Sequence, residues 1–201
     1  MPRAFSTLER EHIRKALIQA AASEIAAKGF RKLSIDTLVH AVHISKGAFY
    51  LFYGSKEMLV FDVLREVQES ARKELEAVIN RESAGTDDDV ASRLLRALFS
   101  VFTSFPVFAE LVKPDSLVEL VRGLPQEALD TELESDETFF QSLFGGLVKK
   151  KQIRKLPLSV LSGLPRMVLA LEANKEMIGL DRYNELKEMF ISGMAKELRR
   201  E

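Results

Sequence analysis

The chain has 201 residues and a formal net charge of −1, and 46% of its residues are hydrophobic. This composition predicts a substantial core and excludes wholesale disorder. The absence of cysteine excludes a disulfide framework and a thiolate metal site. No segment has the apolar length of a membrane span or of a signal-peptide core, so we expect a cytoplasmic protein with no membrane partner.

The charge is distributed unevenly along the chain. Residues 1–56 contain nine Lys and Arg but only four Asp and Glu. The rest of the chain contains 20 Lys and Arg and 26 Asp and Glu. A basic N-terminal quarter is typical of a segment that meets an anionic partner such as nucleic acid. Chance variation on solvated helix faces explains the same asymmetry, and charge alone leaves both interpretations open.

A capping box predicts the start of the first helix. Ser6 stands three residues before Glu9, the spacing at which each side chain bonds the other residue's backbone N–H group. An apolar stripe at helical spacing follows and ends at Gly29, a typical C-terminal cap; Phe30 and Leu33 beyond it are expected core residues. The stripe contains Ile13, Ala16, Leu17, Ala20, Ala21, Ile25 and Ala26.

Two short helices and a longer one are expected next. Ser34 can cap a helix that ends near Val42, Ser45 can cap a second short helix, and Ser55 can cap a longer one. Two short helices joined by a tight turn behind a longer helix indicate a helix-turn-helix, over residues 34–53. In that motif the second helix presents its first residues to base edges in the major groove.

The residues at the start of the Ser45 helix favour close contact with DNA. Gly47 costs about 1 kcal/mol relative to Ala inside a helix, but with Ala48 it lets the backbone approach the groove floor. Lys46 and Lys56 stand at helix starts and are expected to contact phosphates, as are the backbone N–H groups there.

Three aromatic residues are expected to position this helix. Phe49 and Tyr53 are four residues apart, so they share one helical face and can anchor it to the small domain. Tyr50 can offer its hydroxyl group to a phosphate while its ring packs inward.

The remainder of the chain also has helical periodicity. The segment NRESAGTDDD at residues 80–89 predicts a break, Pro106 and Pro114 predict short pieces, and a helix is expected from about Asp136. The last two helices are expected at about residues 158–178 and 182–200. About nine helices in an all-α protein are therefore expected, with no sustained strand pattern.

The residues at 34–59, SIDTLVHAVHISKGAFYLFYGSKEML, resemble the helix-turn-helix of the TetR family of bacterial repressors. Gly47, Tyr50 and Lys56 match that pattern directly, and Ser34 stands where the family has Thr. The resemblance implies a DNA-binding domain at residues 1–54 and a ligand-binding and dimerisation domain at 55–201. It therefore implies a regulator, most simply a repressor, that binds a double-stranded DNA operator.

Three departures from the family pattern stand in the motif, one of which is Val42 at a position where the family has Ala. His43 occupies the position of the turn glycine, where a positive φ is expected; His tolerates this better than most residues. Leu51 and Phe52 replace polar aromatic residues, which removes possible phosphate hydrogen bonds.

The resemblance also implies a homodimer through the last two helices, as a four-helix bundle. Apolar stripes predict the interface, and Gly163 and Gly193 would let helices approach closely. The stripes contain Leu161, Leu164, Val168 and Leu171 on the first helix, and Leu186, Phe190 and Met194 on the second.

Seven of the thirteen phenylalanines fall between Phe99 and Phe144. A well-packed core explains most of them, but rings interrupted by two prolines can also line an apolar ligand cavity. The resemblance implies such a cavity for a small inducer of unknown identity. The candidate wall residues are Phe99, Phe102, Phe108, Phe140 and Phe144.

No other motif predicts chemistry. His40 and His43 are three residues apart, but two histidines make an incomplete metal site, so neither metal nor cofactor is expected. No nucleophile–base grouping or phosphate-binding loop is present, which disfavours an enzyme. A helical protein-interaction module that does not bind DNA is the alternative from another class; it explains the helices but not the Ser-Lys-Gly stretch.

Overall fold

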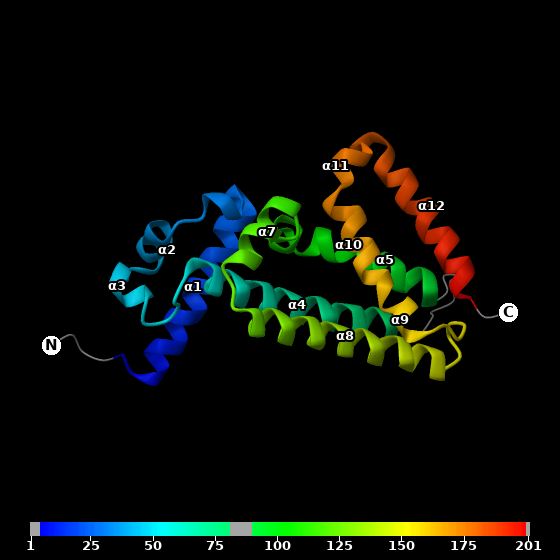
Figure 1. The fold of residues 1–201 in the computed structure, drawn as a ribbon, viewed down its shortest axis with the longest axis horizontal. Coiled ribbons are helices and arrows are strands. Elements are labelled where there is room, and N and C mark those ends of the chain that lie inside the picture. The colour runs from blue at the N-terminus through cyan, green and yellow to red at the C-terminus, as the bar shows by residue number, and fades with distance from the viewer. Residues whose placement is uncertain (1–4, 81–89, 200–201) are drawn as a thin grey trace. The chain divides into compact units, whose positions relative to one another are not determined.

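The structure is a computed structural model that describes residues 5–80 and 90–199. All regular secondary structure in these residues is helical and none is strand, which confirms the all-α prediction (Figure 1). In chain order the elements are α1 (Thr7–Lys28), the 3₁₀ helix η1 (Phe30–Lys32), α2 (Ile35–Val42), α3 (Lys46–Phe49), α4 (Lys56–Asn80), α5 (Val90–Ser104), α6 (Pro106–Leu111), α7 (Pro114–Arg122), α8 (Gln126–Lys149), α9 (Leu158–Leu161), α10 (Gly163–Ala173), α11 (Lys175–Ile178) and α12 (Leu180–Leu198).

The chain forms more helices than the nine expected, because long predicted segments are divided. Residues 158–178 form α9, α10 and α11 instead of one helix, with breaks at Ser162 and Asn174. Helix α8 starts ten residues before the expected Asp136, directly after Pro125. The break predicted at residues 80–89 lies, apart from Asn80, outside the described residues.

The predicted caps are present at the helix starts. Ser6 and Glu9 form the complete capping box of α1. The hydroxyl groups of Ser34, Ser45 and Ser55 accept hydrogen bonds from backbone N–H groups three residues on, at 3.1, 3.0 and 3.2 Å. Each serine hydroxyl group accepts from a backbone N–H group that has no acceptor within its own helix. Interactions between residues close in sequence therefore fix where these helices begin.

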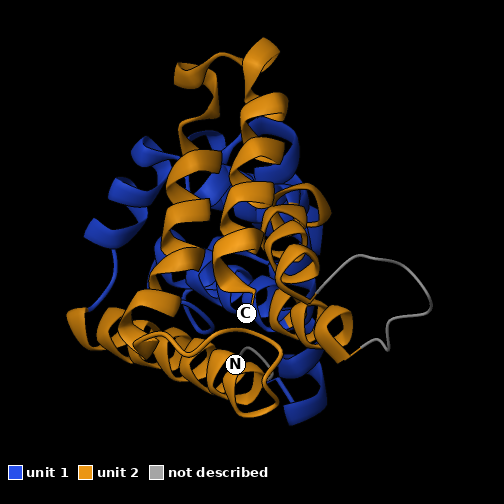
Figure 2. Cartoon of the chain, turned by 90° about the vertical axis from the view of Figure 1, so that its right-hand side faces the viewer, with its two compact units in different colours: residues 1–69, 106–125 blue, residues 70–105, 126–201 orange. Residues whose placement is uncertain are grey.

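The chain divides into two compact units (Figure 2). Unit 1 contains residues 1–69 and 106–125, and unit 2 contains residues 70–105 and 126–201. Residues 106–125 thus group with the helix-turn-helix, which the resemblance did not imply. The domain boundary expected after residue 54 remains a prediction.

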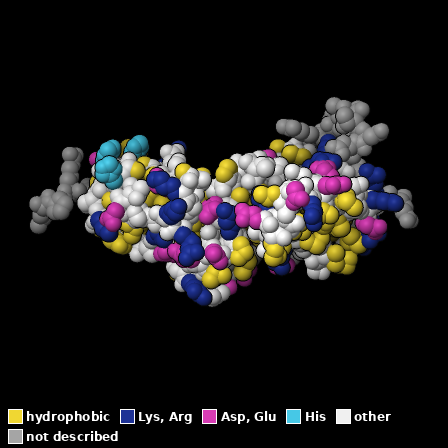
Figure 3. All heavy atoms as spheres, turned by 90° about the horizontal axis from the view of Figure 1, so that it is seen from above, with side chains coloured by type: hydrophobic (Ala, Val, Ile, Leu, Met, Phe, Trp, Pro, Cys, Tyr) yellow, Lys and Arg dark blue, Asp and Glu magenta, His cyan; other side chains and the backbone are white. Residues whose placement is uncertain are grey.

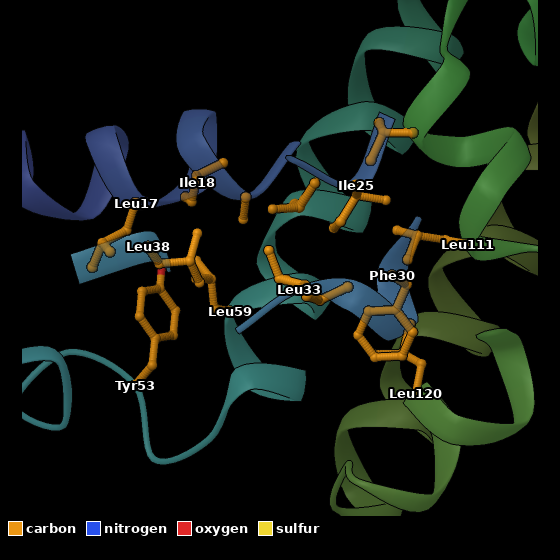
Figure 4. Packing of buried hydrophobic residues seen from close by; sticks show 14 of the residues in the cluster. Leu17, Ile18, Ile25, Phe30, Leu33, Leu38, Tyr53, Leu59, Leu111 and Leu120 are labelled. Atoms are coloured by element: carbon orange, nitrogen blue, oxygen red, sulfur yellow. The ribbon is translucent and has the colours of Figure 1, made fainter. Parts of the chain in front are cut away.

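The core of unit 1 explains this grouping. Phe30, fully buried in η1, belongs to the same hydrophobic cluster as Leu111 of α6 and Leu120 of α7 (Figure 4). Leu17, Ala21 and Ile25 of the predicted α1 stripe are buried there too, with Ile18, which the stripe omitted. Ala26, predicted to belong to the stripe, is instead exposed.

In unit 2, α5 packs against α10 and α12, and α8 packs against α9. Helix α5 is buried along most of its length, including Leu94, Leu95, Phe99 and Phe102. Among the described residues, no helix has the length and apolarity required to cross a membrane.

Candidate nucleic-acid interface

The turn between α2 and α3 depends on a residue in a left-handed conformation. His43 has φ 57° and ψ 42°, as expected for the position where the resembled pattern has glycine. The turn is closed by a hydrogen bond from Ile44 N–H to the Val39 carbonyl oxygen at 3.0 Å. Histidine therefore bears a modest conformational cost that positions α3 after α2.

Helix α3 exposes its first turn. Ser45, Lys46 and Gly47 are exposed, and Ala48 is half-buried. A Cβ atom added at Gly47 would meet the Ser45 Oγ at 3.9 Å, which is an ordinary contact. Since the fold leaves room for a side chain at Gly47, packing within the chain does not require glycine there.

Two aromatic rings hold α3 against unit 1, as predicted. Phe49 is fully buried, and its ring centroid lies 6.0 Å from that of Tyr53, which is also buried. The Tyr53 hydroxyl group donates a hydrogen bond to the Asp62 carboxylate of α4 at 3.1 Å. Burial raises the pKa of Tyr53 above its ordinary range, so the phenol stays protonated as this donor.

Tyr50 differs from the prediction in its orientation. Its side chain is 52% exposed rather than packed inward, because Phe49 occupies the buried face of this short helix. The Tyr50 ring contacts the Phe49 ring edge-on with centroids 5.5 Å apart. This orientation leaves the hydroxyl group on the same exposed surface as the α3 start.

Lys46 lies on this surface with an acidic partner. Its Nζ atom is 3.0 Å from Oδ1 and 3.1 Å from Oδ2 of Asp36, and both side chains are more than half exposed. The hydrogen bond from Lys46 to Asp36 raises the pKa of the lysine above its ordinary value. The spacing of the two residues in the sequence did not indicate this ion pair. A phosphate that binds Lys46 would have to displace the Asp36 carboxylate.

Lys56 is placed differently from Lys46, although both begin a helix. Its side chain is 18% exposed, and its Nζ atom lies 4.6 Å from the Phe30 ring centroid. The same amino group donates to Glu119 of α7 at 3.4 Å. Lys56 thus joins η1, α4 and α7 within unit 1, and it is far less exposed than its place at a helix start suggested.

The structure adds Arg10 to this region. Its guanidinium group donates to the Leu51 carbonyl oxygen at 3.2 Å and lies 5.1 Å from the Phe52 ring centroid. Leu51 itself is 60% exposed. The apolar residues that replace polar aromatics are therefore fixed to α1 by an arginine rather than left as a free loop.

Ser34 is less available than its place in the resembled pattern implies. Its hydroxyl group caps α2 and also lies 2.8 Å from the Thr37 hydroxyl group. A phosphate at this position would therefore meet the α2 N-terminus rather than a free serine side chain.

The candidate ligand-binding phenylalanines are divided between the two units. Phe108 lies in α6 of unit 1, whereas the other four lie in unit 2. Phe140 stacks on the buried Phe144 with centroids 6.3 Å apart. Phe99 contacts Phe190 edge-on at 5.9 Å, and Phe102 is buried.

The stripes predicted for dimerisation lie mostly on the buried faces of their helices. Leu161, Leu164 and Val168 are at most 5% exposed because they pack inside unit 2. Of the α12 stripe, Leu186 is 48% exposed, whereas Phe190 contacts Phe99 of α5.

Other apolar side chains of these helices are exposed. Met167, Leu186 and Met189 are 42%, 48% and 64% exposed. At Gly163 and Gly193 an added Cβ would meet nothing within 4 Å, so neither glycine mediates close packing within the chain. Figure 3 shows hydrophobic side chains gathered among charged ones in the right-hand half of the view.

The histidines form no metal site. Within the described ranges no group of three or more His, Asp and Glu side chains is placed to hold a metal ion. Figure 3 shows histidine side chains at the end that carries α2 and α3.

Comparison with known proteins points to one family. Residues 17–63 match the family model described as bacterial regulatory proteins, tetR family. Over 100 residues the chain is 29% identical to an uncharacterised HTH-type transcriptional regulator, YdgC, of Bacillus subtilis (strain 168). That match covers 50% of this chain and 51% of the relative, so it spans about half the length of each.

Solved structures share the fold over nearly the whole chain. RolR in complex with its ligand resorcinol is 16% identical with a TM-score of 0.66, and the match covers 98% of this chain and 92% of RolR. The fatty acid degradation regulator FadR from Bacillus halodurans is 14% identical with a TM-score of 0.61, and the match covers 94% of this chain and 97% of FadR. Identities this low establish the fold alone.

Proposed function

We propose, from the premise that the chain belongs to the TetR family of bacterial transcriptional regulators, that it binds an operator in double-stranded DNA and responds to a small molecule. The observation that carries the proposal is the exposed start of α3. A capped helix with an exposed lysine and a glycine that packing does not require is suited to the major groove.

The proposed DNA surface consists of the α3 start and its neighbours. Lys46 and the Tyr50 hydroxyl group contact phosphates, and Gly47 and Ala48 bring the backbone to the base edges. Ser34 and Ser45 contribute the N-termini of α2 and α3. Lys56 supports this surface from inside unit 1.

The proposed assembly is a homodimer through the outer faces of α10 and α12. Met167, Leu186 and Met189 supply apolar contact, and Gly163 and Gly193 leave room for a partner helix. A two-fold dimer sets two α3 helices at a spacing near one DNA turn, about 34 Å, or a multiple.

The proposed regulation is release from the operator when a small, largely apolar inducer binds in unit 2. RolR, which shares the fold, is a resorcinol complex, and FadR is named for fatty acid degradation. An inducer that prefers a dimer with another α3 spacing lowers DNA affinity, and DNA must then lower inducer affinity equally. Repression follows when the operator overlaps a promoter.

Replacing Lys46 with alanine tests the DNA surface. We expect weaker binding to all duplex sequences and a salt dependence reduced by about one unit, because one phosphate contact is lost. Lys56→Ala is the matched contrast: it should lower the melting temperature and leave the salt slope unchanged, because Lys56 contacts Phe30 and Glu119. A salt slope that is unchanged in Lys46→Ala would contradict the proposal.

Replacing Gly47 with alanine separates DNA contact from folding. We expect the free protein to gain about 0.5–1 kcal/mol of stability, because alanine is the better helix former and finds room. DNA affinity should fall about tenfold or more, equivalent to about 1.4 kcal/mol, because the added methyl group prevents close approach. Chemical denaturation and fluorescence-anisotropy titration measure the two effects; equal or tighter DNA binding would show that this surface faces no DNA.

The alternative, a helical protein-interaction module, predicts a different result for both variants. Such a module would not bind duplex DNA in a salt-dependent way. Neither Lys46→Ala nor Gly47→Ala would then change a DNA affinity or a salt slope.

A further inference from the structure

An acidic side chain lies on the surface that is proposed to meet DNA. Asp36 is in the first turn of α2, and both of its carboxylate oxygens lie within 3.1 Å of the Lys46 amino group at the start of α3. Figure 1 shows that α2 and α3 are neighbours. Because DNA is a polyanion, a carboxylate at this place opposes binding unless it has a role of its own.

Folding of unit 1 depends little on this ion pair. The side chains of Asp36 and Lys46 are 74% and 53% exposed, and exposed ion pairs contribute little to stability because solvent screens them. The start of α2 already has its cap, since the Ser34 hydroxyl group accepts a hydrogen bond from Thr37 N–H. The Asp36 carboxylate is therefore available to a bound molecule.

The ion pair links two contacts with DNA. A phosphate that binds Lys46 displaces the Asp36 carboxylate, because both compete for the same amino group. The displaced carboxylate then faces DNA, where phosphate oxygens repel it. A hydrogen-bond donor on a base edge gives it a new partner, so the base at that position decides whether the exchange is favourable.

Two bases offer such a donor in the major groove, and a carboxylate distinguishes between them. Cytosine presents its N4 amino group alone, whereas adenine presents its N6 amino group beside the N7 acceptor. Both oxygens of an ionised carboxylate are acceptors, so the adenine N7 atom repels the second oxygen. Cytosine is therefore the base that the Asp36 carboxylate fits best.

We propose that Asp36 is a specificity-determining residue, which accepts a hydrogen bond from the N4 amino group of a cytosine in each operator half-site. Lys46 supplies affinity for phosphates in any sequence, whereas Asp36 weakens binding to every sequence that lacks this cytosine. The inference rests on the proposed function, because it requires the surface around α3 to bind duplex DNA.

Selection from a random duplex pool with the wild-type chain and two Asp36 variants tests this role. We expect the wild type to enrich a cytosine in each half-site, and Asp36→Ala to lose that cytosine while it keeps the other selected bases. Asp36→Asn should replace the cytosine with adenine, because an asparagine amide donates to N7 and accepts from N6. The matched control Glu24→Ala also separates an acid from a lysine within unit 1, and it should keep the wild-type sequence.

Affinity for two fixed duplexes provides a second readout. Asp36→Ala should bind the duplex selected by the wild type about fivefold or more weakly for each cytosine contact that it loses. It should bind a duplex of scrambled sequence as tightly as the wild type or more tightly, because no carboxylate then competes for Lys46. A structural role for Asp36 would instead weaken binding to both duplexes equally, which would contradict the proposal.

The selection separates this inference from the proposed function. If the wild type and Asp36→Ala select the same base at every position, this inference is overturned and operator binding stands. If the wild type enriches no sequence at all, the proposed function fails and this inference fails with it.

Discussion

Replacing Leu186 and Met189 together with glutamate is expected to give a folded monomer. Both side chains are about half exposed or more, so the substitutions disturb little within one chain. In the proposed dimer they would bury carboxylates against apolar helix faces, at a cost that the interface cannot offset. Sedimentation should report a monomer with unchanged helical circular dichroism.

Loss of the dimer should have a large effect on DNA binding. Two linked α3 helices bind two half-sites with an avidity that exceeds either contact by about 10²–10⁴-fold, and a monomer loses that gain. Leu164→Glu is the informative contrast, because Leu164 is buried within unit 2 and its substitution should unfold the chain instead. If the Leu186/Met189 variant stays dimeric and folded, the interface lies on another face.

Replacing Phe49 with alanine is expected to unfold much of unit 1. Phe49 is fully buried between Tyr50 and Tyr53 and is the side chain that holds α3 in place. Removing a buried ring costs about 3–5 kcal/mol, a large share of the roughly 5–15 kcal/mol that stabilises an ordinary protein. Urea denaturation at a fixed protein concentration measures the loss.

The neighbouring aromatic residue serves as the control for Phe49. Tyr50→Ala removes an exposed ring, so stability should change little while DNA affinity falls. Similar losses of stability in both variants would contradict the assignment of Phe49 as the anchor and Tyr50 as the surface residue.

The local features of the fold could be predicted from the sequence because they depend on neighbours along the chain. Ser6, Ser34, Ser45 and Ser55 cap helices through residues three positions on, which spacing alone reveals. His43 takes the left-handed conformation for an equally local reason.

The placement of Lys56 and of residues 106–125 could not be predicted, because both depend on distant partners. Lys46 and Lys56 follow the same Ser-Lys pattern, yet one pairs with exposed Asp36 and the other lies beneath Glu119. Lys56 and Glu119 are too far apart in the sequence for any local pattern to indicate their contact. The shared core of Phe30, Leu111 and Leu120 helps to bring α6 and α7 into unit 1.

The last helices show a different limit of prediction. Helix α12 carries apolar residues on two faces, with the buried Ile191 and Ala195 on one and the exposed Met189 on the other. Periodicity identifies an apolar face but not which of two faces packs inside the chain. The residues chosen from the sequence are mostly on the buried face, although Leu186 among them is 48% exposed.

Selection of bound sequences from a random duplex pool tests the central claim most directly. Operator recognition by a two-fold dimer predicts enrichment of one sequence with inverted symmetry, whose half-site centres are separated by about 34 Å or a multiple. Its binding should weaken steeply as salt is raised. Recovery of a pool no different from the starting one, with no salt-dependent binding, would contradict the assignment of α3 as a DNA-reading helix.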